Sequence, residues 1–248
     1  MVRITWIYRK LFCRKGYGVH SPFVYDLIKQ VIEEKCHFYA YRNISLIRLQ
    51  LLQNEQFIHY KGKRITVKKA LRRYGISKKE GELLFRLTNY FKPHTILCIG
   101  SSLGLIPLYL TRYDSTVQCI TLESEPDFAN KAMYFLRREE NPSLQIQIGS
   151  ISETVPESIV QFQRIDCIYI NKNVGINDLE VIFTQCFPYV HDTAFCVLAG
   201  IRSSKEKYHY WKQLCQHPNV TVTIDLFYTG ILFFKPDLHK RVYKTIPL

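Results

Sequence analysis

The stretch Thr-Ile-Leu-Cys-Ile-Gly-Ser-Ser-Leu-Gly, residues 95–104, decides the fold that we expect for this chain. Its apolar run ends at Gly100, and a helical pattern starts near Gly104. This predicts a buried strand that leads through a glycine turn into a helix, because glycine permits sharp bends and close contact with a ligand. About 20 residues later a second apolar run, 117–122, ends in Glu123, where an acid can accept hydrogen bonds from ribose hydroxyls. The order favours a cofactor site; an ordinary crossover without a ligand is the alternative.

The composition fits one α/β domain, or one domain with a substantial N-terminal extension. The chain has 248 residues, of which 47% are hydrophobic, and this is enough to form a large core. No apolar run approaches the roughly 18 residues that span a bilayer, and we identify no secretory signal. The eight cysteines show no metal-ligand spacing, and those inside predicted strands behave as small hydrophobic residues. We therefore expect a cytoplasmic protein.

The positive charge is confined to the first part of the chain. Residues 1–90 hold 19 Lys and Arg against 6 Asp and Glu, which accounts for the whole net charge of +13, whereas residues 91–248 hold 15 of each. This asymmetry suggests an anionic partner for the N-terminal part. A solvated basic face that only keeps the protein soluble is the alternative.

Beyond residue 90, apolar runs alternate with amphipathic helical patterns, which predicts a doubly wound, mostly parallel sheet covered by helices. Five strands are expected, at 95–99, 117–122, 144–148, 165–170 and 194–199. The closely spaced β-rich runs 220–227 and 230–234 predict an antiparallel hairpin at one edge of the sheet.

Residues 1–90 read as a basic helical extension. Two apolar stripes with helical spacing carry this prediction: Val24, Leu27, Ile28, Val31 and Ile32, and then Leu83, Leu84, Leu87, Tyr90 and Phe91. A short segment with Ile4, Ile7 and Leu11 on one face, flanked by Arg3, Lys10 and Arg14, is also expected to be helical.

At this point the residues indicate a family. The chain resembles the class I S-adenosylmethionine-dependent methyltransferases, and more closely a bacterial O-methyltransferase-like group with a Gly-x-His-Ser-Pro-Phe element near its N-terminus. Gly18-Val19-His20-Ser21-Pro22-Phe23 matches that element, as residues 84–87, 95–104 and 220–234 match other stretches of the group. The resemblance covers most of the chain. It implies a Rossmann-like methyltransferase domain over 91–248, with residues 1–90 as an extension or lid.

The resemblance also implies a set of residues that bind S-adenosylmethionine. Gly100, Ser102 and Gly104 would cradle the methionine end, and Glu123 would bind the ribose hydroxyls. Gly149 and Ser150 would lie beside the adenine, and Asn171 would complete the set after the fourth strand. All of these positions follow strands of the predicted sheet, where open α/β sheets bind ligands.

Several acids of the family are replaced in this chain. Cys98 and Asn171 stand where relatives carry acids, Ala199 and Gly200 replace an acidic pair, and Ser150 replaces the acid often found beside the adenine. Divalent cations prefer anionic oxygen ligands, so we predict no metal site. We assign no catalytic residue; His20, Tyr41 and His209 are candidates for a base.

We therefore predict a metal-independent S-adenosylmethionine-dependent methyltransferase that acts on a small-molecule or anionic acceptor. The alternative is a degenerate methyltransferase fold that serves as a non-catalytic binding or regulatory module. We do not expect nucleic acid as a partner, because no RNA-binding module is recognisable. The Gly-x-x-x-Gly spacing speaks against a dinucleotide-dependent oxidoreductase.

The role of the basic N-terminus is left between two hypotheses. A short basic segment with bulky apolar side chains could contact an anionic membrane surface. It could instead pack as a lid over the cofactor cleft and steer an acidic acceptor towards it. We prefer the lid, because the resembling family carries an N-terminal helical extension next to its active site.

Overall fold

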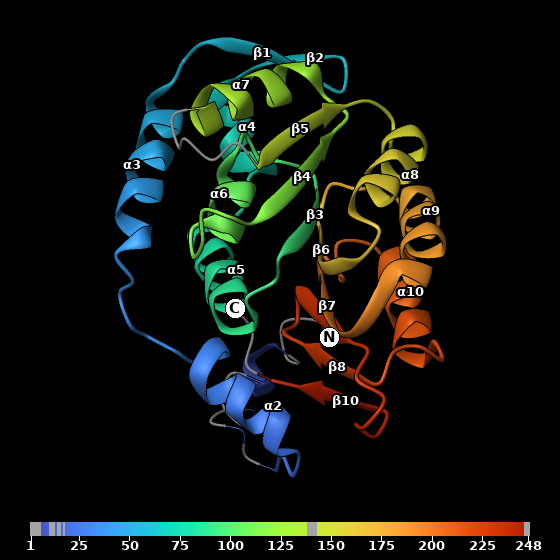
Figure 1. Ribbon diagram of the computed structural model, residues 1–248. Helices are drawn as coiled ribbons and strands as arrows, with labels where there is room; N and C mark the ends of the chain where they lie inside the picture. Colours follow the sequence, from blue (N-terminus) through green and yellow to red (C-terminus); the bar gives the residue numbers. More distant parts are fainter. Residues whose placement is uncertain (1–5, 10–12, 14–15, 17, 138–142, 246–248) are drawn as a thin grey trace.

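A mostly parallel sheet forms the centre of the molecule. A computed structural model describes residues 6–9, 13, 16, 18–137 and 143–245 (Figure 1). In this part of the chain, eight strands form one sheet in the order β10-β8-β9-β7-β6-β3-β4-β5. The five predicted parallel strands are confirmed as β3 (Thr95–Ile99), β4 (Gln118–Glu123), β5 (Leu144–Ile148), β6 (Ile165–Ile170) and β7 (Val190–Ala199).

The strand order reverses at β3. The chain first adds β4 and β5 on one side of β3 and then crosses to add β6 and β7 on the other. The backbone N–H of Gly100 donates to the carbonyl of Leu122 at 2.8 Å, and that of Asn171 donates to the carbonyl of Ile99 at 2.9 Å. These bonds hold together the ends of three neighbouring strands at the point where such sheets form a ligand crevice.

Helices cover both faces of the sheet, as the doubly wound prediction requires. Strand β3 sends Ile96 and Cys98 into one core and Leu97 and Ile99 into the other, so both of its faces are buried. The first core lies under α5 (Lys78–Phe91), α6 (Leu105–Thr111) and α7 (Pro126–Leu136), and the second lies under α8 (Ile151–Phe162), α9 (Ile176–Cys186) and α10 (Lys205–Gln216). Strands buried on both faces read as continuous apolar runs, which is why the sequence revealed them.

The C-terminal hairpin is confirmed, but its predicted place at the edge is wrong. Strands β8 (Val222–Asp225) and β9 (Thr229–Phe233) pair antiparallel, and β9 joins β7. The edge is β10 (Arg241–Lys244), which runs parallel to β8. Only Tyr243 of this short strand is buried, so the strand lacks the apolar run that marks the others.

The sequence suggested that residues 1–90 form a helical extension, but the described part of this region also contains a β-hairpin. Helix α2 (Pro22–Leu27) continues as the π-helical turn η1 (Ile28–Ile32), and α3 (Ala40–Gln53) and α4 (Val67–Tyr74) flank an antiparallel hairpin of β1 (Phe57–Tyr60) and β2 (Lys63–Thr66). The hairpin turns at Lys61 and Gly62, both with positive φ, a conformation that favours tight hairpins. Its strands are too short to produce a clear alternation in the sequence.

The N-terminal elements share a core with the sheet. Leu27, Leu51 and Leu83 are buried in the same cluster as Ile96 of β3, and α3 runs along the outside of the molecule between α2 and the β1–β2 hairpin (Figure 1). The proposed boundary at residue 90 stays a prediction.

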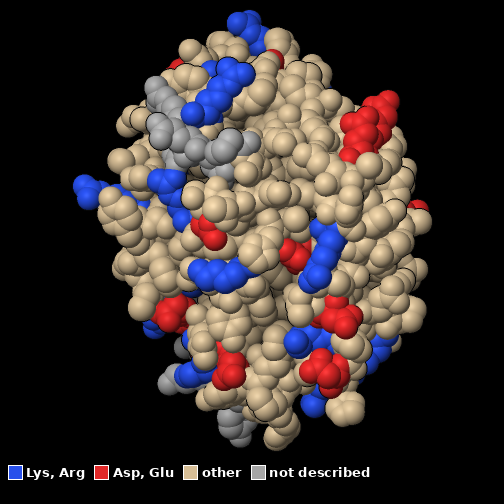
Figure 2. All heavy atoms as spheres, in the orientation of Figure 1, with Lys and Arg blue, Asp and Glu red and all other residues tan. Residues whose placement is uncertain are grey.

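The surface charges are mixed on the face seen in Figure 1. Figure 2 shows Lys and Arg interspersed with Asp and Glu there, in the described part of the chain. Within the same residues, no helix is long and apolar enough to cross a membrane.

Candidate functional site

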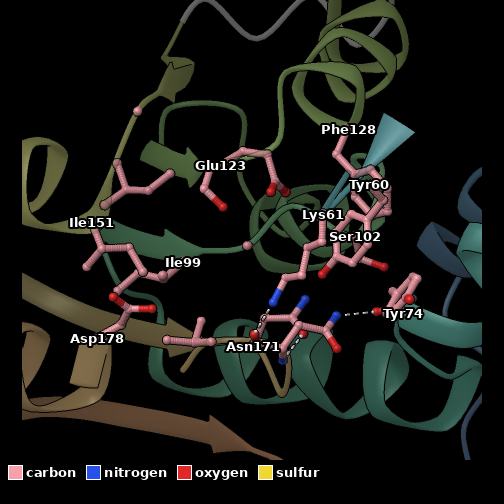
Figure 3. A pocket seen from close by; sticks show the side chains of 16 residues that line it. Tyr60, Lys61, Tyr74, Ile99, Ser102, Glu123, Phe128, Ile151, Asn171 and Asp178 are labelled. Atoms are coloured by element: carbon pink, nitrogen blue, oxygen red, sulfur yellow. Dashed lines mark hydrogen bonds between the residues drawn. The ribbon is translucent and has the colours of Figure 1, made fainter. Parts of the chain in front are cut away.

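A cleft lies at the carboxyl ends of the strands around the reversal point (Figure 3). All seven residues predicted to bind the cofactor are described, and five of them line this cleft: Gly100, Ser102, Glu123, Gly149 and Asn171. The other two lie beside it. Gly104 backs onto Ala132 of α7, and the hydroxyl of Ser150 donates to Glu153 at 2.6 Å in the first turn of α8. The structure therefore brings most of the predicted set together.

The turn after β3 requires glycine at its start. Gly100 has a φ of +90°, and a Cβ there would lie 2.7 Å from the Cβ of Asn171. A side chain would thus be strained and would also collide with the end of β6. Ser102 follows with a φ of 51°, and its hydroxyl accepts a hydrogen bond from the backbone N–H of Ile76 at 2.8 Å. The turn after β3 is thus held by close packing on the end of β6 and by the hydrogen bond from Ile76, which lies between α4 and α5.

Glu123 ends β4 with its carboxylate directed into the cleft (Figure 3). Its Oε2 accepts hydrogen bonds from the backbone N–H of Ser101 at 2.9 Å and from the Ser101 hydroxyl at 2.6 Å. Its Oε1 accepts one longer bond, 3.4 Å, from the N–H of Glu125. Burial raises the pKa of Glu123, against the opposing effect of the Ser101 hydrogen bonds. One carboxylate oxygen is thus held in place while the other keeps capacity for a ligand hydroxyl.

Aromatic rings form one wall of the cleft. The ring of Tyr60, from β1, lies 4.1 Å from that of Tyr74 and 4.5 Å from that of Phe128, centroid to centroid. Tyr60 is buried, and this burial raises the pKa of its phenol. Sequence reasoning missed this wall, because Tyr60 reaches the cleft through the unpredicted hairpin.

The tip of the hairpin closes over the cleft. The backbone N–H of Lys61 donates to the carboxylate of Glu125 at 3.0 Å. The Lys61 ammonium reaches across to the carbonyl of Asn173 at 3.5 Å (Figure 3). The cavity of this partly open cleft measures about 80 Å³, whereas pockets for small organic ligands usually measure about 300–1,000 Å³. We therefore expect a ligand the size of a nucleoside to displace the Lys61 side chain or the hairpin tip.

The fold is shared with solved methyltransferases at low sequence identity. The O-methyltransferase from Bacillus cereus in complex with SAH matches with a TM-score of 0.57 at 14% identity, over 94% of this chain and 100% of that chain. A putative O-methyltransferase from Klebsiella pneumoniae has a TM-score of 0.57 at 14% identity, over 93% and 99%. The O-methyltransferase TomG from Streptomyces achromogenes in complex with SAM has a TM-score of 0.57 at 15% identity, over 85% and 95%. The chain has the class I methyltransferase fold.

The similarity to these methyltransferases is one of structure and not of sequence. No protein-family model matches the sequence, and the search of curated proteins finds no match. At 14–15% identity, the solved methyltransferases establish the fold of this chain and leave its chemistry to be argued from its own residues.

Beside the cleft, the chain after β6 is tied to the end of α4. Asn171, at the end of β6, accepts a hydrogen bond from the N–H of Asn173 at 3.2 Å. The amide of Asn173 donates to the carbonyl of Tyr74 at 2.8 Å. The loop after β6 and the loop between α4 and α5 therefore form one rim of the cleft.

None of the three candidate bases lines the cleft. His20 and His209 are exposed elsewhere, and Tyr41 is buried, with its hydroxyl donating to the carbonyl of Glu82 at 3.3 Å. Cys98 is fully buried in the first core, and burial raises the pKa of its thiol well above the ordinary value, which fits a packing role. Among the described residues no group of three or more His, Cys, Asp or Glu could hold a metal ion. The absence of a metal site stays a prediction.

Proposed function

We propose that this protein is an S-adenosylmethionine-dependent methyltransferase that works without a metal ion. One observation carries the proposal: five residues predicted from the resemblance meet in one cleft at the reversal point of the sheet, with the Glu123 carboxylate directed into it. The SAM- and SAH-bound structures of the same fold support this choice of cofactor.

The residues of the cleft fit this cofactor. A Cβ on Gly100 would lie 2.7 Å from the Cβ of Asn171, so glycine lets the turn after β3 pack closely against the end of β6, beside the position expected for the methionine end. The carboxylate of Glu123 offers Oε1 to ribose hydroxyls. Gly149, at the end of β5, lines the same cleft on the side expected for the adenine.

The chemistry asks little of the protein beyond placement. S-adenosylmethionine supplies a methyl group that is already activated on a sulfonium sulfur. The rim formed by Asn171, Asn173 and Tyr74 would orient an acceptor towards that methyl group, and correct orientation supplies much of the acceleration in such reactions. We assign no base.

Calorimetric titration of the full chain tests the proposal. We expect S-adenosylmethionine and S-adenosylhomocysteine to bind with micromolar dissociation constants and NADH, the control, not to bind. Failure of both sulfur compounds to bind at millimolar concentration would reject the proposal.

That failure would favour the second function, a non-catalytic binding or regulatory module. Two observations support this alternative. The cavity is about 80 Å³ and is bridged by Lys61, and Cys98, Asn171, Ala199 and Gly200 stand where the resembling family carries acids.

A further inference from the structure

Three lysines from separate elements gather at the loop after β6, which borders the cleft. Lys61 lies at the tip of the β1–β2 hairpin, Lys172 in the loop after β6, and Lys207 on α10. The ammonium groups of Lys61 and Lys207 both donate to carbonyls of that loop, those of Asn173 at 3.5 Å and Lys172 at 2.6 Å. We call Lys61, Lys172 and Lys207 the lysine cluster.

Carboxylates lie near the cluster, since Glu125 accepts the backbone N–H of Lys61 at 3.0 Å and Asp178 lines the same cleft, but among the residues that the structure describes none is paired with its ammonium groups. Within the described part of the chain, no carboxylate forms an ion pair with any of the three ammonium groups. Lys172, like the other two, donates to a backbone carbonyl, that of Gly75 at 2.9 Å. A carbonyl satisfies a hydrogen bond but does not neutralise a charge, so the positive potential of the cluster remains.

Two members of the cluster, Lys172 and Lys207, are partly buried, whereas Lys61 is exposed. Burial and the nearby charge of Lys61 lower the pKa of Lys207 to about 8. Lysines held this close oppose one another's charge, and a bound anion relieves that repulsion. This repulsion between the ammonium groups favours a negatively charged ligand over a neutral one.

The cluster lies next to residues that line the cleft. Gly200, at the end of β7, has a φ of +74°, and a Cβ there would lie 2.7 Å from the Cβ of Lys172. Glycine at this position thus allows the loop after β7 to pack directly on Lys172. The residues on either side of Lys172 in the chain, Asn171 and Asn173, line the cleft. The cluster therefore stands at the edge of the proposed donor site.

We propose that the lysine cluster binds a carboxylate or phosphate group of the methyl acceptor. This assignment of acceptor class rests on the proposed methyltransferase function. Ammonium groups recognise both kinds of anion through charge-assisted hydrogen bonds, and the two sources are separated by the choice of probe.

The test uses calorimetry on the full chain with two probes, inorganic phosphate and benzoate, each titrated with and without S-adenosylhomocysteine. We expect the wild type to bind at least one probe. Lys207→Gln and Lys172→Gln should each weaken that binding by about tenfold or more, the loss of one hydrogen bond to a charged group. Lys207→Arg, which keeps the charge, should retain it. Lys212→Gln is the matched control, because Lys212 lies exposed on the same helix.

Two results would overturn the assignment: no binding of either probe by the wild type, or equal binding by Lys207→Gln, Lys172→Gln and the control. A third concerns the cofactor. Methylthioadenosine resembles S-adenosylhomocysteine but lacks its carboxylate. If the cluster variants bind S-adenosylhomocysteine more weakly than the wild type but bind methylthioadenosine equally well, the cluster holds the cofactor carboxylate instead. Wild type that binds phosphate or benzoate but no S-adenosylhomocysteine would reject the methyltransferase function and leave the anion site standing.

Discussion

A single oxygen of Glu123 accepts both hydrogen bonds that Ser101 donates, from its backbone N–H at 2.9 Å and from its hydroxyl at 2.6 Å. The contact joins the end of β4 to the turn after β3, so the two segments expected to hold the ribose and the methionine end are linked before any ligand arrives. The Glu123 side chain is 7% exposed, which limits the orientations it can adopt. Such preorganisation reduces the cost of ordering the site on binding.

Replacement of Glu123 should therefore weaken donor binding. We expect Glu123→Ala to raise the dissociation constant of S-adenosylhomocysteine by an amount equivalent to about 1.5–3 kcal/mol, the usual value of hydrogen bonds to a charged group. Titration calorimetry measures this, with circular dichroism to confirm folding. Ser101→Ala is the control: it removes the hydroxyl but leaves the carboxylate, so its effect should be smaller. A folded Glu123→Ala variant with wild-type affinity would contradict the assignment.

Donor binding should also depend on pH. Burial raises the pKa of Glu123 above its ordinary value of 4.5, and only the ionised carboxylate is a pure acceptor for ribose hydroxyls. Affinity should be full above the raised pKa and fall as the pH is lowered through it, starting at a higher pH than an ordinary glutamate would give. Affinities measured across this range check the prediction, and Glu123→Gln should lack the decline. A decline of equal size in that variant would point to another group.

Chelation should leave any methyl transfer intact. Asn171, Ala199 and Gly200 stand where the resemblance to methyltransferases implies carboxylates in metal-dependent relatives, and divalent cations prefer anionic oxygen ligands. We expect equal methylation rates with and without excess EDTA. Activity that disappears with the chelator and returns with magnesium would show the interpretation to be wrong.

Most of the strands and helices that the sequence predicted correctly have a buried apolar run or a regular apolar stripe. Strands β3, β4 and β6 are buried on both faces and appear as apolar runs, and α9 buries Leu179, Ile182 and Phe183 at helical spacing. The β1–β2 hairpin and β10 escaped notice because their strands contain exposed residues and no buried run, unlike the equally short β8, which is buried throughout. Their pairing depends on partners that the local sequence does not specify.

The candidate site likewise contains some residues that the sequence predicted and others that it did not. Gly100 and Glu123 could be identified because a turn and a strand end leave a local pattern, and the structure places both in the cleft. Tyr60 and Lys61 could not, because they enter the cleft only through the folding of the hairpin across α7. Likewise, Lys207 meets Lys61 and Lys172 through three separate elements, and no spacing in the chain indicates that meeting.

One basic residue of the N-terminus has a structural role. Arg9 is 3% exposed and donates to both oxygens of Asp225, at 2.8 and 3.1 Å, while Arg202 binds the same oxygens at 2.8 and 2.6 Å. Burial alone would raise the pKa of Asp225, but the hydrogen bonds from Arg202 and Arg9 lower it. The stabilisation is thus present above the ordinary pKa of 3.8 and is lost as the pH falls through the lowered value.

Replacement of Asp225 should destabilise the protein more than replacement of Arg9. We expect Asp225→Ala to lower the free energy of unfolding by about 3–5 kcal/mol, because it leaves buried arginines without a partner. Arg9→Met should cost less, since Arg202 still neutralises Asp225. Urea denaturation at pH 7 measures both. If Arg9→Met and Asp225→Ala cost the same, the compensating role of Arg202 would be wrong.

The membrane hypothesis for the N-terminus can be tested separately from stability. Ile4, Lys10, Leu11, Arg14 and Lys15 lie outside the described residues, but Arg9 is buried against Asp225 and so is not available to lipid headgroups. We therefore keep the preference for a lid and expect the protein not to sediment with anionic vesicles. A variant with Lys10, Arg14 and Lys15 all changed to Gln is a better control than a deletion of residues 1–15, because it keeps the Arg9 ion pair. Salt-sensitive binding to anionic but not neutral vesicles, lost in that variant, would instead place these side chains at a membrane surface, where each contributes about 1 kcal/mol.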